Sequence, residues 1–346
     1  MDARPSREQR ELADAVDRLA HKLGPNTVGD LDDLERRERL DAALVQAGWR
    51  ELRTGTAAAP QASGVEAAIV TRSLARRCCD TAIIGPLLAH DLLRRAGSDG
   101  DEVTRAIVMA DGLQSLVVGS PHAGLTTSGV AVDVSGSTTG VLLVDDGGAG
   151  GIAIGIAPLG GPIEGVDLTR PVTPLAAGAE ISSVDRARRL SPDDITAWTA
   201  LAVTLTAADL VGAMEGAVAL ATEYARERRQ YGAAIGSYQA VQHMLADAKT
   251  LSEGAASAMI HAAWAADALA PDAARAAAAV AKAYASRAAR TVCETAIQVH
   301  GGIGNTWECM AHVFLRRTLL ATELFGGDGP QLALLAQQRW GATNGL

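Results

Sequence analysis

Aromatic residues are scarce in this chain, since Phe, Trp and Tyr together make up 3% of its 346 residues. Alanine is abundant instead, and side chains of this size let helices pack closely against one another. A chain of this length suits two or three packed units in one polypeptide and can bury a large core. We therefore expect a mainly helical protein with small side chains at its helix contacts.

Cysteine is rare as well. The four cysteines have neither the spacing of a zinc site nor the density of a disulfide framework. We therefore do not expect a fold that is held together by zinc or by disulfides. The N-terminal stretch MDARPSREQREL is charged from its second residue, unlike a signal peptide. We therefore expect reduced thiols, no bound metal and a cytoplasmic location.

An excess of positive charge is also missing, because the formal net charge is −9. Non-specific nucleic-acid binding depends on a basic surface, so this chain is a poor candidate for it. The run Thr196–Thr222 is long and apolar, but it contains Asp209 and Glu215. A charge at the centre of a bilayer costs about 3 kcal/mol, so this run indicates a buried bundle helix rather than a membrane span.

Three regions of different composition follow one another. The range 1–110 shows helical periodicity, as in SREQRELADAVDRLAHKL. The range 111–188 is rich in Gly, Val, Ser and Thr, and its runs SLVVG, GVAVDV, GVLLVDD and GIAIGIA indicate strands rather than a flexible linker. The range 189–346 returns to helices, beginning at SPDDITAW with an N-cap serine and a proline. The predicted fold is α+β and mostly α, with an N-terminal helical domain, a small central antiparallel β-domain and a C-terminal long-helix bundle.

A basic cluster stands where the first long helix of the bundle is expected to end, near Gln230. The stretch 224–247 reads YARERRQYGAAIGSYQAVQHMLAD and contains Arg226, Arg228 and Arg229. These arginines either complement the C-terminus of a helix, which is worth roughly a few tenths of a kcal/mol, or bind an anion. The residues alone leave both readings open.

The order of the three regions, together with two motifs, resembles the acyl-CoA dehydrogenase family of flavoproteins. The stretch 224–247 is similar to the family's segment of Tyr, Arg and Gln-aromatic-Gly. AIQVHGGIGNTWECMAHVFLRR is similar to its Gln-x-x-Gly-Gly-x-Gly segment, and VDLTRPV at 166–172 is a weaker likeness. The layout is similar over the whole chain, whereas the residue detail is strong only over about 212–317.

The resemblance implies FAD as cofactor and a dimer of dimers. In the family, the first motif touches the pyrophosphate and adenine of an FAD held mainly by a neighbouring subunit. The cofactor-binding residues implied here are Arg228, Gln230, Tyr231, Ile235, Tyr238, Gln298, Gly301 and Gly302. Gly232 is expected to break the helix, so that the backbone turns under the ligand.

Several residues of the second motif have less direct readings. For Gly301, Gly302 and Gly304 the alternative to ligand contact is an ordinary helix stop and turn. His300 is expected to have a packing or surface role. Arg316 matches the position of a family arginine, and the resemblance implies a structural role for it beneath the active site.

The family's catalytic base is missing. Dehydrogenation at Cα–Cβ of a thioester needs a base for the α-proton, while the flavin takes the hydride. The family's glutamate position falls on Phe325, or on Gly326 after a one-residue shift, and a second family position falls on Ala202. Glu323 and Asp328 are the nearest carboxylates and are weak candidates for a displaced base.

The family's Thr-Glu-Pro loop, which holds the flavin ring, is not found in the β-region either. These losses are similar to those of one subunit in bacterial α2β2 members that act on steroid-like CoA thioesters. The resemblance therefore implies a base-less subunit with a paralogous partner, an acyl-CoA substrate, and electron-transfer flavoprotein or another acceptor. The alternatives are a self-sufficient homo-oligomeric flavin dehydrogenase, oxidase or monooxygenase, and a non-enzymatic scaffold of the same fold.

Overall fold

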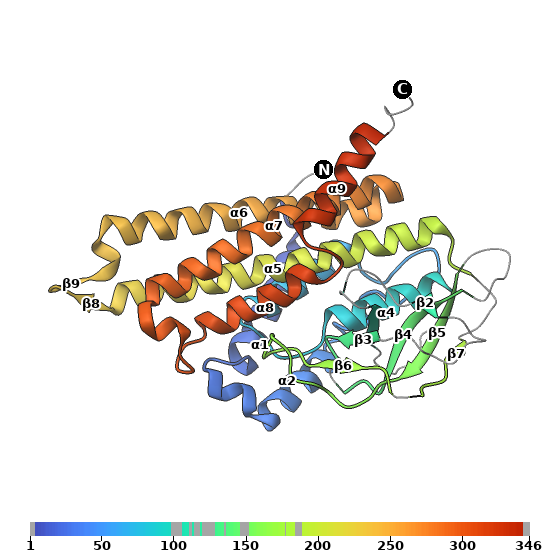
Figure 1. The fold of residues 1–346 in the computed structure, drawn as a ribbon, viewed down its shortest axis with the longest axis horizontal. Coiled ribbons are helices and arrows are strands. Elements are labelled where there is room, and N and C mark those ends of the chain that lie inside the picture. The colour runs from blue at the N-terminus through green and yellow to red at the C-terminus, as the bar shows by residue number, and fades with distance from the viewer. Residues whose placement is uncertain are drawn as a thin grey trace.

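Helices open and close the chain, and a sheet lies between them (Figure 1). The structure is a computed structural model that describes residues 4–97, 106–110, 113, 118–119, 129–134, 136–145, 152–176, 178–183 and 189–341. The first helices are α1 (Arg7–Leu23), η1 (Val28–Asp32), α2 (Leu34–Gln46), α3 (Gly64–Ala75) and α4 (Ile84–Arg95). The later ones are α5 (Pro192–Glu227), η2 (Ile235–Ser237), α6 (Gln239–Ala268), α7 (Pro271–His300), η3 (Gly301–Asn305), α8 (Ala311–Glu323) and α9 (Asp328–Trp340). This architecture confirms the α+β, mostly α class.

Local capping chemistry explains where several helices begin. Before α5, the Ser191 side chain accepts the N–H of Asp194, while the Asp194 carboxylate accepts the N–H of Ser191. Pro192 occupies the first turn, where a missing N–H has no consequence. Ser6 and Ser63 form the same reciprocal box at the starts of α1 and α3. These starts are therefore encoded locally.

The described strands form a mixed sheet. They are β1 (Ala106–Ala110), β2 (Val118–Gly119), β3 (Gly129–Val132), β4 (Thr139–Val144), β5 (Ala153–Pro158), β6 (Val172–Pro174) and β7 (Ser182–Ser183). Their order is β6-β3-β1-β4-β5-β7, with β2 beside β4. Both β1 and β2 run parallel to β4, whereas the other described pairs in this sheet are antiparallel.

The expectation of a wholly antiparallel sheet was therefore wrong. The run Ala106–Ala110 was assigned to the helical range, yet it enters the sheet as β1 between β3 and β4. Of the expected strand SLVVG, only Val118–Gly119 belongs to the described residues, and there it forms β2. The division at 1–110, 111–188 and 189–346 stays a prediction.

The long helix α5 runs through the centre of the bundle. It packs against α3, α6, α7 and α8, and in Figure 1 it lies alongside α6 and α7 with the sheet at one end. By length and composition it is apolar enough to cross a membrane, but 78% of its most apolar window is buried inside the protein. Cβ atoms at Gly212 and Gly216 would lie 2.2 Å from the carbonyl oxygens of Arg72 and Arg76. Glycine therefore allows α5 to approach α3 closely, as a core helix does.

A buried ion network joins the bundle to the loop that precedes β6. Asp209 of α5 accepts from Nη2 of Arg317 at 2.7 Å and from Nη2 of Arg170 at 2.9 Å. Arg170 also donates to Asp167 at 2.8 Å, and Arg317 donates to the hydroxyl of Thr169 at 2.8 Å. Burial acts to raise the pKa of Asp209, but the two guanidinium groups outweigh it and hold that pKa below its usual value.

We expect Asp209→Ala to lower the free energy of unfolding by about 3–5 kcal/mol, because it leaves two buried guanidinium groups without their shared counter-ion. The urea midpoint of the purified chain measures the loss. Glu253→Ala is the matched control, since it breaks only the exposed Lys249–Glu253 pair on α6. Equal midpoints for the two variants would contradict a central role for this network.

Candidate functional site

The basic cluster lies on a hairpin at the far end of the bundle. Helix α5 ends at Glu227, earlier than the expected end near Gln230, and Arg228 caps it by donating its N–H to Tyr224 O at 2.8 Å. The carbonyl of Arg228 then accepts the N–H of Ile235 at 2.8 Å, which closes the base of the hairpin.

The hairpin pairs β8 (Arg229–Gln230) with β9 (Ala233–Ala234). Tyr231 and Gly232 form its two-residue turn, with φ of 50° and 82°. Positive φ at both positions suits a primed hairpin turn. Gly232 therefore does not break the helix, as was expected, but turns this hairpin. Figure 1 shows the hairpin projecting beyond α5 and α6.

The side chains predicted to contact FAD in this segment are open to a ligand. Arg228 and Gln230 are exposed, and Tyr231 at the turn is 97% exposed. Tyr238 is also exposed and donates its hydroxyl to Gln230 O at 2.9 Å, while Ile235 is half-buried. Within the described residues, Arg228 forms no ion pair, so its planar fork of donors is free to meet a phosphate.

The second predicted motif forms a glycine corner at the same end of the bundle. Gln298 is exposed in the last turn of α7, and Gly301 ends that helix with a φ of +66°. A Cβ at either Gly301 or Gly302 would meet nothing within 4 Å. Backbone conformation demands glycine at 301, and both positions leave room for a ligand to approach the backbone.

An aromatic contact connects the two motifs. The ring of Tyr224, in the last turn of α5, stacks on His300 at 4.4 Å between centroids. His300 is buried, and its Nδ1 contacts Ala296 O at 2.7 Å. The expected packing role of His300 thus has a structural basis. The exposed arginine and the open glycine corner together suit the diphosphate of a dinucleotide such as FAD.

The turn that should carry the base is closed. Phe325 is buried, and its N–H donates to Leu113 O at 2.7 Å. Its ring lies edge-on to Trp198 of α5 at 5.8 Å. The cavity beside Phe325 measures only about 20 Å³. Ala202, at the second expected base position, is fully buried in α5.

Gln331 of α9 holds this turn in place through hydrogen bonds. Its Nε2 donates to Phe325 O at 2.7 Å and to Gly326 O at 3.2 Å, and its Oε1 accepts from Arg275 at 2.8 Å. Gln331 is itself 1% exposed. The turn is therefore held by buried polar contacts rather than left open for a substrate.

The two candidate carboxylates lie away from this turn's interior. Glu323 is exposed at the end of α8. Asp328 begins α9, where its partly exposed side chain faces Arg287 at 3.6 Å. The structure brings neither carboxylate to the buried side of Phe325.

The structural arginine of α8 is Arg317 rather than Arg316. Arg317 is 1% exposed and reaches Asp209, whereas Arg316 is half-buried and lies over the ring of Trp307 at 5.6 Å. The expectation for Arg316 was therefore wrong by one position. Two adjacent arginines do not reveal in sequence which one faces the core. Counted from Arg317, the family's base position falls on Gly326 rather than on Phe325.

The sequence reading also missed a buried lysine. Lys282 of α7 is fully buried, and its Nζ donates to Ala321 O in α8. Burial lowers its pKa from 10.5 to about 7, although Asp209 and Glu323 act to raise it. From the sequence, a single lysine in an alanine-rich helix is expected to be exposed. The burial of Lys282 is therefore evident only from the packing of α7.

The matching family model agrees with the layout. Residues 201–339 match the acyl-CoA dehydrogenase C-terminal domain. With the mainly helical fold and small mixed sheet, this match makes the chain similar to the acyl-CoA dehydrogenase family. That family consists of oxidoreductases that act on CH–CH bonds and generally bind FAD.

Particular relatives can be named. The chain is 29% identical to acyl-CoA dehydrogenase IpdE2 of Mycobacterium tuberculosis over 276 residues, covering 80% of this chain and 78% of that protein. It resembles the ChsE4–ChsE5 complex from Mycobacterium tuberculosis with a TM-score of 0.80, 22% identity and 100% coverage of both chains. It resembles the Tcur3481–Tcur3483 steroid ACAD with a TM-score of 0.79 and 22% identity, covering 97% of this chain and 99% of that one. The two structural likenesses show the fold alone.

We expect Lys282→Met to change how stability depends on pH. Between pH 7 and pH 10.5 the unfolded chain keeps the proton on Lys282 while the folded chain loses it. Stability of the wild-type protein then rises with pH in this window, and Lys282→Met lacks that rise. Urea midpoints across the window measure the effect, with the exposed Lys249→Met as control. Parallel pH profiles for wild type and Lys282→Met would refute the assignment.

Proposed function

We propose that this chain is the base-less subunit of a heteromeric acyl-CoA dehydrogenase. Its residues contact the nucleotide part of an FAD that is held mainly by a paralogous partner. The observation that carries the proposal is the buried Phe325–Gly326 turn, which stands where the family needs a carboxylate. The fold is similar to that of acyl-CoA dehydrogenases, whereas this turn lacks the carboxylate that the resemblance implies.

The closed turn argues against a complete active site in this chain. Proton removal needs a carboxylate or another base within hydrogen-bond reach of the substrate. Phe325 and Gly326 offer none, and Gln331 binds both of their carbonyls. Sites for small molecules usually measure about 300 Å³ or more, far above the cavity beside Phe325.

At the opposite end of the bundle, the candidate site residues are exposed rather than buried. Arg228, Gln298 and Gly302 are exposed, and a Cβ at Gly302 would meet nothing within 4 Å, which suits a ligand that arrives with another molecule. Helix α8 separates the glycine corner from the closed turn by about 20 Å, at 1.5 Å per residue. This separation supports nucleotide contacts that serve a flavin ring held outside this chain.

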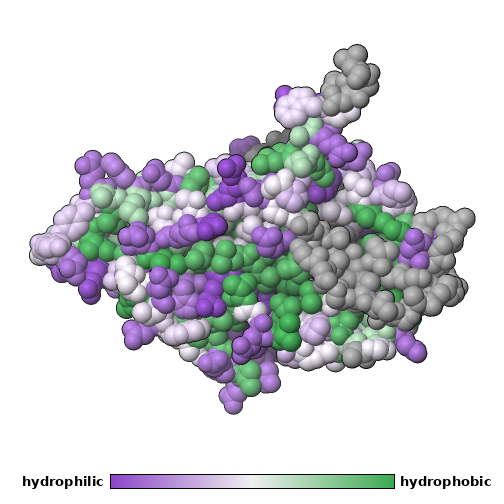
Figure 2. Space-filling view, viewed as in Figure 1, coloured by the Kyte–Doolittle hydropathy of each residue, from purple (hydrophilic) through white to green (hydrophobic). Residues whose placement is uncertain are grey.

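The surface offers room for such a partner. Figure 2 shows apolar side chains gathered in a band across the middle of one face. Apolar bands of this kind commonly mark contacts between subunits. The IpdE2 and ChsE4–ChsE5 likenesses support a paralogous acyl-CoA dehydrogenase as the partner.

In the proposed assembly, the partner would supply the base for the α-proton of the thioester, and bound FAD would supply the hydride-accepting chemistry. The residues of this chain would hold and orient the cofactor: Arg228 would donate to the diphosphate, Gln298 would hydrogen-bond the adenosine side, and Tyr231 would pack against the adenine. The steroid ACAD likeness supports a bulky, steroid-like CoA thioester as substrate. We expect electron-transfer flavoprotein or another acceptor to reoxidise the flavin, in the cytoplasm.

Co-expression tests the subunit role. The chain purified alone should show little flavin absorbance at about 450 nm, because its own turn is closed and the ring has no pocket. Co-expression with a paralogous acyl-CoA dehydrogenase subunit should give a flavin-containing, active complex. A yellow and active protein from the single chain would instead favour the self-sufficient flavoenzyme.

We expect Arg228→Ala in this chain to weaken FAD binding by the complex by about tenfold or more. A hydrogen bond to a charged group is worth about 1.5–3 kcal/mol, and about 1.4 kcal/mol corresponds to tenfold in affinity. Fluorescence titration of the flavin-stripped complex measures the change. The control is Arg10→Ala, an exposed arginine on α1. Unchanged FAD affinity in Arg228→Ala would rule out the lent contact and favour the scaffold reading.

A further inference from the structure

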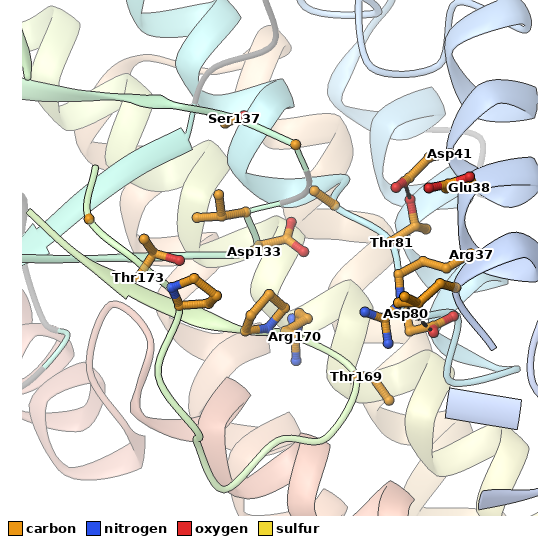
Figure 3. A pocket seen from close by; sticks show the side chains of 17 residues that line it. Arg37, Glu38, Asp41, Asp80, Thr81, Asp133, Ser137, Thr169, Arg170 and Thr173 are labelled. Carbon is orange, nitrogen blue, oxygen red and sulfur yellow. Dashed lines mark hydrogen bonds and ion pairs between the residues drawn. The ribbon is translucent and has the colours of Figure 1, made fainter. Parts of the chain in front are cut away.

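A cavity lined by both apolar and charged residues lies beside the buried ion network, away from the bundle end that carries the nucleotide motifs. It measures about 470 Å³ and is bounded by α2, the segment 80–82, the β3–β4 turn and the loop between β5 and β6. Figure 3 shows side chains from these segments facing a common space. Its volume falls within the range of about 300–1,000 Å³ found for small-molecule sites.

One wall of this cavity holds a guanidinium group with an unused nitrogen. Arg170 donates a hydrogen bond from Nε to Asp167 and another from Nη2 to Asp209. Its Nη1 is buried and has no hydrogen-bond partner among the described residues. A buried donor without a partner costs about 1–3 kcal/mol, and more when the group is charged. A feature this unfavourable calls for a ligand or water that the cavity admits.

A second arginine lines the same cavity from α2. Arg37 donates from Nε to Asp80 at 3.0 Å and from Nη2 to Leu31 O at 2.6 Å. No hydrogen bond of its Nη1 occurs within the described residues. Arg37 and Arg170 both line the cavity, and each has one guanidinium nitrogen without a hydrogen-bond partner among the described residues. Acceptor oxygens of an anion suit these donors.

The cavity also contains acceptors. Asp133 is buried, and its Oδ2 accepts the N–H groups of Ile83 and Gly85, both at 2.9 Å. Glu38 and Asp41 project from α2 at the opposite side in Figure 3. A bare anion would meet these carboxylates unfavourably, whereas a ligand that also carries a donor would satisfy both kinds of group.

We propose that this cavity binds a small hydroxy- or amino-carboxylic acid. Its carboxylate accepts from Nη1 of Arg170 and of Arg37, and its hydroxyl or ammonium group donates toward Asp133 and Glu38. The site is separate from the nucleotide contacts, so it stands whether or not the proposed subunit role is correct.

Binding is tested on the full chain by isothermal titration and thermal shift. The probes are L-lactate, L-serine, acetate and lactamide. We expect L-lactate or L-serine to bind and to raise the melting temperature. Acetate lacks the donor and lactamide lacks the charge, so both should bind at least about tenfold more weakly, the equivalent of about 1.4 kcal/mol. No binding by L-lactate or L-serine, or equal binding by acetate or lactamide, would overturn the proposal.

A pair of glutamates on α2 supplies matched variants. Glu38 lines the cavity and Glu35 does not, although both are exposed. Glu38→Gln should weaken binding by about tenfold, because the donor group of the ligand loses a charged acceptor, while Glu35→Gln should leave it unchanged. Arg170→Gln is less informative, since it also disturbs the ion network and can impair folding. Equal affinities for the two glutamate variants would locate the binding elsewhere and refute this site.

Discussion

The carboxylate of Asp209 is the contact on which the interior depends, because it is the shared counter-ion of two buried arginines. It lies within α5, Arg317 lies on α8, and Arg170 lies in the loop before β6. Arg317 also donates to Cys79 O, just after α3, at 3.0 Å. Charges buried without partners are strongly unfavourable, so these segments must come together in one arrangement. The network therefore fixes α8 against α5 and against the loop that precedes β6.

In that arrangement, the segment at one end of α8 is buried and the segment at the other end is exposed. At one end the Phe325–Gly326 turn packs against Trp198 and is bound by Gln331. At the other end the Gly301–Gly302 corner stays open beside the exposed Arg228 hairpin. The chain thus combines a buried turn at the predicted base position with an exposed segment at the predicted nucleotide contacts. In the proposed assembly a partner subunit supplies the base, which a self-sufficient homo-oligomeric enzyme would have to find within this chain.

The sequence predicted features that depend on neighbouring residues. It did not predict which side of a helix or strand packs against the rest of the protein. Capping boxes such as Ser191 with Asp194 placed helix starts, and the absence of a base at Phe325, Gly326 and Ala202 was visible in the residues. The hairpin at Tyr231–Gly232 was read as a simple helix break, because one glycine does not distinguish a stop from a two-residue turn. The strand β1 was missed, since a short apolar run after helices has no period of its own.

Residue order alone indicated the helical bundle and the likeness to acyl-CoA dehydrogenases, and it predicted that no carboxylate stands at the family's base position. Those properties reside in periodicity and in residue identity. The choice of Arg317 over Arg316, the burial of Lys282, and the cavity shared by Arg37 and Arg170 were decided only by tertiary structure. Each of these depends on which side of an element meets a segment distant in the chain, and that is set by packing and desolvation rather than by neighbouring residues.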